Sequence, residues 1–204
     1  GGPSAHLALF RVEFVEKRTL DVFMDCHIRA FTYLGGVPKE ILYDNMKHVV
    51  NGKPAFNIEF ARFAHHYEFH PRLCPFYAPW VKGKAERPIQ YVRERFWRGY
   101  PYRSLEKANA DVQEWLAETA HARIHGTYWQ PVCERWEKEK TFLGSLPPQY
   151  DTSLKLFRPV YKECQLSYNG NRYLVPHHVA GKKVMLKIKG KTIRIYHDQE
   201  LLAT

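Results

Sequence analysis

The stretch AFTYLGGVPKEILYDN at residues 30–45 decides how the first half of the chain folds. Its Gly35-Gly36 pair ends a helical pattern, because glycine readily takes the left-handed backbone conformation found at helix ends. The run EILYD (40–44) that follows is short, apolar and ends in an acid. Such a run is typical of a buried β-strand that presents one carboxylate, here Asp44, at its carboxyl end. The stretch therefore predicts a helix, a turn and a strand.

Strand and helix patterns alternate on both sides of this stretch. Upstream, LALFRVEFV (8–16) is rich in β-forming residues and predicts a strand, and Thr19 is expected to cap the helix that follows. Downstream, Asn57 is expected to cap a second helix. The run FHPRLCPF (69–76) predicts a strand at a sheet edge, because proline cannot donate a backbone hydrogen bond inside a sheet. This alternation indicates an α/β or α+β core.

The core is expected to continue through two further helices and to end at a proline-rich break. A loop over residues 79–83 precedes a helix from about Lys84 to Trp97, and Ser104 is expected to cap the next helix. The stretch SLPPQYD (145–151) marks the domain boundary. We therefore expect a core domain over residues 1–145 and a second domain over residues 150–204.

The second domain has the pattern of a small all-β domain. An Asn169-Gly170 step, the strongest short signal for a β-hairpin, lies between two short apolar runs. Beyond it the apolar residues recur with period two, opposite a basic face made of Lys183, Lys187, Lys189 and Arg194. One apolar and one basic face suit a small β-barrel that touches phosphates. The alternative is a solvated lysine face without a partner.

Charge favours a polyanionic partner. The 204 residues contain 31 Lys and Arg against 21 Asp and Glu, which gives a formal net charge of +10. The surplus lies in two places: seven basic and two acidic residues over 72–98, and ten basic and four acidic residues over 150–204. Both clusters are interleaved with aromatic residues, which favours nucleic acid over a merely solvated surface.

Several classes of protein find no support in the sequence. The four cysteines are 48, 59 and 31 residues apart, so neither a disulfide framework nor a zinc ribbon is expected, and a reducing cytoplasmic setting fits. No apolar run approaches the roughly 18 residues that span a bilayer, and the first residues do not resemble a secretory signal. The motifs of nucleotide hydrolases and serine hydrolases are also missing.

Two carboxylates are the candidates for metal-dependent chemistry. Phosphodiester chemistry uses two Mg²⁺ ions about 3.5–4 Å apart, held by acidic side chains from different elements. Asp44 ends a predicted strand, and Glu86 is expected in the first turn of a helix, inside the basic run KGKAE (82–86). An acid among so many bases is either a metal ligand beside a phosphate track or a surface ion pair. The sequence alone leaves both readings open.

Histidines offer a rival metal site. Zinc could be held by the cluster of His65, His66 and His70, or by His121 and His125, which are four residues apart on an expected helix. Neither group has the surrounding pattern of a known zinc motif, so buried or surface histidines are the default interpretation.

Several runs of the sequence together resemble the motifs of a known protein family. The runs AFTYLGGVPKEILYDN (30–45), FARFAHHYEFHPRLCPFYAP (60–79) and KGKAE (82–86) resemble transposases of the IstA type, within the DDE integrase superfamily. The resemblance continues through RIHGTYWQPVCERWEKEK (123–140), LPPQYD (146–151) and YNGNRYLVP (168–176). It implies a ribonuclease-H-like core whose three acids bind two Mg²⁺ (or Mn²⁺) ions, followed by a small β-barrel. It also implies cleavage of transposon ends and their joining to target DNA.

The resemblance also implies residue roles and partners. Asp44 matches the second acid of the family and Glu86 the third. Asn45, Lys82 and Lys84 match their motif neighbours and are assigned to DNA near the metals, together with Arg87, Arg93 and His125. The implied partners are double-stranded DNA, an IstB-like ATPase and further copies of the chain, and the implied location is the bacterial cytoplasm at the nucleoid.

One feature departs from the family pattern. The first acid is expected on an opening strand upstream of Phe10, yet GGPSAHLAL (1–9) contains no acid, and Glu13 is a weak substitute. The sequence therefore predicts a transposase fragment without the amino-terminal DNA-binding region and the first catalytic aspartate, with a core incomplete at its first strand. Two alternatives stay open: a nuclease or strand-transferase with an unrecognised third ligand, and a catalytically dead nucleic-acid-binding module.

Overall fold

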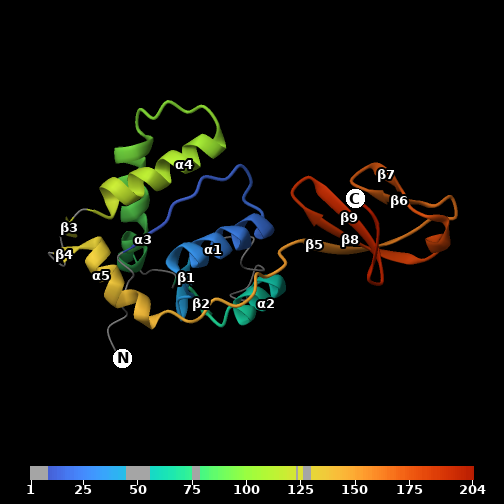
Figure 1. Cartoon of the computed structure of the whole chain (residues 1–204), viewed down its shortest axis with the longest axis horizontal. Coiled ribbons are helices and arrows are strands. Elements are labelled where there is room, and N and C mark those ends of the chain that lie inside the picture. The colour runs from blue at the N-terminus through green and yellow to red at the C-terminus, as the bar shows by residue number, and fades with distance from the viewer. Residues whose placement is uncertain (1–8, 45–55, 75–78, 123, 126–129) are drawn as a thin grey trace. The chain divides into compact units, whose positions relative to one another are not determined.

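The computed structural model describes residues 9–44, 56–74, 79–122, 124–125 and 130–204. The chain divides into two compact units, residues 1–150 and residues 151–204 (Figure 1). The division falls inside the proline-containing stretch at 145–151. The first unit combines helices with short strands, and the second is built mainly of strands, so the chain is mixed α and β.

The elements of the first unit follow one another closely along the chain. Its helices are α1 (Leu20–Leu34), α2 (Ile58–His66), α3 (Pro79–Val92), α4 (Leu105–Trp115) and α5 (Val132–Glu139). Its strands are β1 (Glu40–Tyr43), β2 (His70–Leu73), β3 (Ile124–His125) and β4 (Gln130–Pro131). The π-helical turns η1 (Arg93–Trp97) and η2 (Leu116–Ala120) extend α3 and α4, and the 3-10 turn η3 (Lys140–Phe142) follows α5.

Residues 30–44 fold as their pattern predicts. Helix α1 ends at Gly35, whose φ of 72° is left-handed, and strand β1 pairs in parallel with β2 from Glu40 opposite His70 to Tyr43 opposite Leu73. Aromatic rings from α1, β1, α2 and the α2–β2 connection fill the core beside these strands. We call this core the aromatic cluster; its members are Phe23, His27, Phe31, Tyr43, Phe60, Phe63, Tyr67 and Phe69.

Two of the expected helix caps are confirmed. The side chain of Asn57 accepts a hydrogen bond from the backbone N–H of Glu59 (2.9 Å), and Ser104 accepts one from the N–H of Lys107 (3.2 Å). Thr19 occupies the N-cap position directly before α1, but its side chain makes no capping hydrogen bond. These caps fix where α2 and α4 begin, because a helix leaves its first N–H groups without partners inside the helix.

The expected loop at residues 79–83 is wrong. Helix α3 begins at Pro79 and runs through this segment into the expected helix. Proline is well suited to the first turn of a helix, because its fixed φ is helical and its missing N–H would have no partner there. As a result, Glu86 lies in the third turn of α3 rather than in the first.

The expected strand at residues 8–16 is also wrong. Residues 9–15 belong to no strand, although Phe10, Val12 and Phe14 pack against the buried cluster of Val92 and Val112. The partners of this segment are side chains of a helix. Asn109 and Gln113 of α4 and His121 after η2 form the side-chain ladder, which bonds Phe14 N and O (2.8 and 2.9 Å), Val12 O (2.6 Å) and Phe10 O (2.9 Å).

The second unit is a four-stranded antiparallel sheet with a separate hairpin. The sheet has the order β10-β9-β8-β5, and its strands are β5 (Leu154–Pro159), β8 (Lys183–Lys189), β9 (Thr192–His197) and β10 (Glu200–Ala203). The hairpin pairs β6 (Gln165–Tyr168) with β7 (Asn171–Leu174), and the 3-10 turn η4 (His177–Val179) precedes β8. Asn169 and Gly170 both have positive φ, 46° and 76°, as a tight two-residue hairpin turn requires.

The observed sheets show less than the full architecture that the resemblance implies. Within the described part of the first unit, the parallel sheet consists of β1 and β2, and β3 pairs with β4 in a second short sheet. In residues 151–204 the hydrogen-bonded order leaves β10 and β5 at the two ends of an open sheet. The mixed α and β class is therefore observed, whereas the ribonuclease-H-like core and the closed barrel remain expectations.

Candidate functional site

Asp44 stands where the sequence places it, directly after strand β1. Its side chain is exposed, and the strand before it is held firmly: Tyr43 O accepts a hydrogen bond from the N–H of Cys74 (2.8 Å) at the end of β2. The neighbouring Tyr43 is buried in the aromatic cluster. Because successive side chains of a strand point to opposite faces, burial of Tyr43 directs Asp44 outward.

A half-buried histidine, His27, anchors this strand end from the core side. His27 Nδ1 lies 2.8 Å from Phe23 O, and His27 Nε2 lies 2.9 Å from the hydroxyl oxygen of Tyr43. A carbonyl oxygen can only accept, so Nδ1–H donates to Phe23 and Nε2 accepts from the Tyr43 hydroxyl. Burial lowers the pKa of His27, against a smaller opposing effect of the bond to Phe23, and burial raises the pKa of Tyr43. Both groups are therefore neutral near pH 7.

Glu86 and its basic neighbours occupy helix α3 and its π-helical extension. Glu86 and Arg87 are exposed on α3, and Arg93 is exposed in η1. Lys82 lies about one helical turn before Glu86, and Lys84 half a turn before it. The side chains of these two lysines lie outside the described part of the structure. Asn45 also lies outside the described residues, and of His125 only the backbone, in β3, is described.

The structure does not complete a three-acid site. Among the residues that it describes, no three His, Cys, Asp or Glu side chains are grouped closely enough to hold a metal ion. Glu13, the weak substitute for the first acid, is held by two guanidinium groups: its Oε1 lies 2.6 Å from Arg29, and its Oε2 lies 3.6 Å from Arg11. Asp44 and Glu86 thus remain the two candidate ligands.

The histidine alternative loses its geometric basis. His121 is buried at the end of η2, where its Nε2–H donates to Phe10 O, and residue 125 lies on strand β3, so the expected four-residue helical spacing is wrong. His66 Nε2 bonds Pro148 O at 2.7 Å. These histidines of the described segments therefore serve structural contacts.

The outer face of the second unit carries the basic residues predicted from the sequence. Val184 and Leu186 of β8 are buried, and the alternating Lys183, Lys187 and Lys189 point to the other face, as the period of two predicts. In the register, Lys187 of β8 is paired with Lys155 of β5 and with Arg194 of β9. We call Lys155, Lys187 and Arg194 the basic row.

A second row of the same face was missed in the sequence. Met185 of β8 is paired with Phe157 of β5 and with Tyr196 of β9, and Tyr196 is paired in turn with Leu201 of β10. We call these four residues the aromatic row. Phe157 has the same parity along β5 as Lys155, and this alternation in LKLFRP (154–159) is the signal that could have identified it.

Asp151 neutralises part of the basic row. Its Oδ2 lies 3.3 Å from the Nζ atoms of both Lys155 and Lys187. Partial burial alone would raise its pKa, but hydrogen bonds from Ser153 and Lys155 outweigh this and hold the pKa of Asp151 well below its usual value. Lys187 Nζ also lies 5.3 Å from the ring centroid of Tyr196, so the basic row touches the aromatic row.

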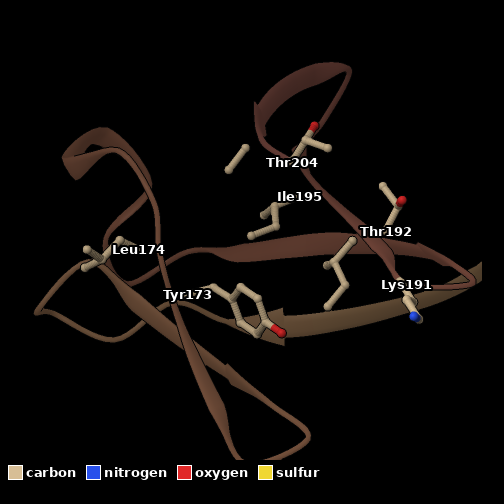
Figure 2. Close-up of a pocket in the computed structure, with 8 residues that line it drawn as sticks. Tyr173, Leu174, Lys191, Thr192, Ile195 and Thr204 are labelled. Carbon is tan, nitrogen blue, oxygen red and sulfur yellow. The ribbon is translucent and has the colours of Figure 1, made fainter.

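A cavity of about 450 Å³ opens beside strands β7, β9 and β10 (Figure 2). Its lining residues are Tyr173, Leu174, Lys191, Thr192, Ile193, Ile195, Ala203 and Thr204. None of their side chains is a carboxylate, an imidazole or a thiol, so the lining side chains offer no metal ligand set. The cavity is distinct from Asp44 and Glu86, which belong to the first unit.

Comparison with known proteins shows that the chain is similar in sequence to several transposases. It is 36% identical over 193 residues to the transposase assigned to insertion sequence element IS5376 of Geobacillus stearothermophilus, over 92% of this chain and 48% of that relative. It is 33% identical over 202 residues to the transposase for insertion sequence element IS21 of Pseudomonas aeruginosa, over 96% of this chain and 52% of the relative. The chain is homologous to the IS21 family of transposases.

A family model and a further relative agree with this relationship. The transposase for insertion sequences IS1326/IS1353 of Pseudomonas aeruginosa is 32% identical over 209 residues, over 98% of this chain and 39% of the relative. The family model described as Mu transposase, C-terminal domain, matches residues 146–204 of this transposase homologue, which contain the basic and aromatic rows. The chain spans about half the length, or less, of these curated relatives. No helix in the described segments is long and apolar enough to cross a membrane.

Proposed function

We propose that this chain is part of a DNA transposase that cuts the ends of a mobile element and joins them to target DNA. The observation that carries the proposal is 32–36% identity to insertion-sequence transposases over 92–98% of the chain. In this proposal the first unit is the ribonuclease-H-like catalytic core, and residues 150–204 form the barrel-like unit that contacts DNA. The chain acts at the bacterial nucleoid, as an oligomer and with an IstB-like ATPase.

Asp44 and Glu86 are the proposed ligands of Mg²⁺ or Mn²⁺. Both are exposed carboxylates, and carboxylate oxygens are the donors that these hard cations prefer. A bound metal pair would activate the attacking oxygen of a phosphodiester exchange and stabilise the leaving one. Asp44 is presented by a strand end that the His27–Tyr43 hydrogen bond anchors, and Glu86 by a continuous helix, so the chain supplies both carboxylates on ordered elements.

Basic residues near these carboxylates are proposed to hold the DNA backbone. Lys82, Lys84 and Arg87 flank Glu86 on α3, and Arg93 follows on η1. Asn45 and His125 are proposed contacts by their match to the family motifs. Their role is to position phosphates near the carboxylates, because cationic side chains attract the nucleic-acid backbone without regard to sequence.

Nicking of supercoiled plasmid in the presence of Mn²⁺ tests the proposal. Any nicking by the unchanged chain is expected to be lost in both Asp44→Asn and Glu86→Gln, whereas the exposed Glu106→Gln on α4 should retain it. Nicking that survives both substitutions would refute the assignment of these two carboxylates. Circular dichroism of each variant checks that the fold is intact.

The second candidate is a nucleic-acid-binding module without catalysis. The observation that favours it is the basic row on the second unit, together with the lack of a three-acid group in the described segments. It predicts salt-sensitive DNA binding that Asp44→Asn and Glu86→Gln leave unchanged, and no nicking. Under either candidate, Lys187→Gln combined with Lys189→Gln should flatten the salt slope of binding by about 2 units, one for each lost phosphate contact.

A further inference from the structure

We propose that the outer face of the β5–β8–β9–β10 sheet binds unpaired, single-stranded DNA, with phosphates on the basic row and bases stacked on the aromatic row. This inference rests on the proposed DNA contact of the second unit and goes beyond it, because it assigns the strand state of the ligand. It also assigns a role to Phe157 and Tyr196, which phosphate binding alone leaves without one.

The register places the two rows side by side. Lys155, Lys187 and Arg194 lie across three neighbouring strands, and Phe157, Met185 and Tyr196 lie across the same three strands two residues further along. Two residues of a strand span about 6.6 Å, and neighbouring strands are about 4.8 Å apart. The face therefore presents a line of cations next to a parallel line of apolar and aromatic side chains, both running across the strands.

The aromatic row is accessible in a way that a core residue is not. Phe157 is 67% exposed on β5, at one edge of the sheet, and Leu201 is 50% exposed on β10, at the other edge. Tyr196 is half-buried beneath the Lys187 ammonium. Bases can stack on such rings with about 1–3 kcal/mol per base, whatever the base, because every base has a π-face.

The charge on this face indicates that the ligand also carries phosphate groups. The carboxylate of Asp151 bridges Lys155 and Lys187, which shows that an anionic oxygen fits between these two cations of the basic row. A phosphate oxygen carries the same charge and the same hydrogen-bonding capacity. A ligand that offers phosphates along one edge and bare apolar rings along the other matches both rows.

That combination selects single strands over duplexes. In a duplex the bases are stacked on one another, and their edges lie in the grooves, so a flat sheet face reaches mainly phosphates and sugars. The basic row alone would bind a duplex and a single strand alike. The aromatic row adds affinity only where bases are unpaired, and this difference can be measured.

The test is fluorescence anisotropy of the full chain with three labelled probes: oligo(dT), an abasic oligodeoxynucleotide of equal length, and a hairpin duplex. Phe157→Ala combined with Tyr196→Ala should weaken oligo(dT) binding by about tenfold or more and leave abasic and duplex binding within about twofold. The conservative pair Tyr196→Phe with Phe157→Trp keeps a ring at both positions and should bind oligo(dT) as the unchanged chain does. Leu174→Ala, which removes an equally exposed apolar side chain (72%) from β7, is the matched control and should change nothing.

The outcomes separate this inference from the function on which it rests. Lys155→Gln combined with Arg194→Gln should weaken binding of all three probes. If that pair leaves every probe unchanged, the DNA contact of this face is refuted and the inference falls with it. Suppose instead that the lysine–arginine pair weakens binding. If the aromatic pair then leaves binding unchanged, or weakens the binding of all three probes equally, only the single-strand assignment is overturned.

Discussion

Residues 9–14 and strand β8 begin from the same kind of pattern and reach different structures. Both alternate apolar and charged residues, FRVEF at 10–14 and LKIK at 186–189. Strand β8 pairs along its length with β5 on one side and β9 on the other. Residues 9–14 have no strand partner in the described structure, and the side-chain ladder of Asn109, Gln113 and His121 bonds their backbone instead.

The difference teaches what an alternating pattern does and does not determine. In both segments it selects the buried face: Phe10, Val12 and Phe14 face a helix cluster, as Val184 and Leu186 face the sheet core. The identity of the edge partner is not in the pattern. The four residue steps along α4 from Asn109 to Gln113 rise about 6 Å, close to the 6.6 Å between alternate residues of an extended chain. A helix can thus imitate a neighbouring strand.

The largest test of this comparison is the loss of a buried side chain from β8. Leu186→Ala should destabilise the second unit by about 2–5 kcal/mol, because it leaves a cavity in a fully buried site. Val12→Ala, at the equivalent position of the half-buried amino-terminal segment, should cost roughly 1 kcal/mol. Urea unfolding with hydrogen exchange as a regional readout measures both. Equal costs would mean that the two segments are equally well packed.

The next test removes one member of the side-chain ladder, Asn109. Asn109→Ala deletes both the acceptor for Phe14 N–H and the donor to Phe14 O, and it should cost about 1–3 kcal/mol, because two half-buried backbone groups lose their partner. Exchange of the Phe14 amide should accelerate, while amides of β8 keep their protection. Glu106→Ala, an exposed change in the first turn of the same helix, is the control. Unchanged exchange at Phe14 would show that the ladder does not hold the segment.

A third test separates the two units by pH. Burial lowers the pKa of His27, so the unfolded chain binds its proton more readily than the folded one. The stability of the first unit should therefore be complete above the unfolded pKa of about 6.5 and fall below it, by at most about 1.4 kcal/mol per pH unit. His27→Gln should remove this contribution to the slope between pH 7 and 5. A slope that persists unchanged in this variant would assign the effect to another group.

The smallest expected effect concerns the outer face of β8. Asp151→Asn should change stability by less than about 1 kcal/mol, because its ion pairs with Lys155 and Lys187 are exposed to solvent. The same change should steepen the salt dependence of DNA binding by up to about one unit, since the basic row loses its internal counter-charge. Binding titrations over a range of salt concentrations measure this. A flatter slope would mean that Asp151 orders the row rather than masking it.

Much of the local structure could be predicted from the sequence because it depends on a few neighbouring residues. The Gly35 helix end, the Asn57 and Ser104 caps and the Asn169-Gly170 hairpin all follow from local backbone chemistry, and each is observed. The strand that ends at Asp44 follows from its apolar run and is also observed. These features need no knowledge of distant partners.

What could not be predicted depends on contacts between residues far apart. Val12 and Gln113 are separated by 101 positions, and Tyr43 and His27 belong to different elements. Nothing in the local pattern around Gln113 indicates that its amide bonds a backbone carbonyl. The aromatic row was missed for the same reason, since Phe157, Met185 and Tyr196 come together only through strand register. The assignment of Asp44 and Glu86 as metal ligands remains a prediction.

The side-chain ladder also bears on solubility. An extended segment exposes a row of N–H and C=O groups along each edge, and such a row is a template on which other chains can add strands. Asn109, Gln113 and His121 bond one edge of a β-prone segment and thereby block the pairing of another strand along that edge. The protection of this edge thus depends on side chains about a hundred positions further along the chain.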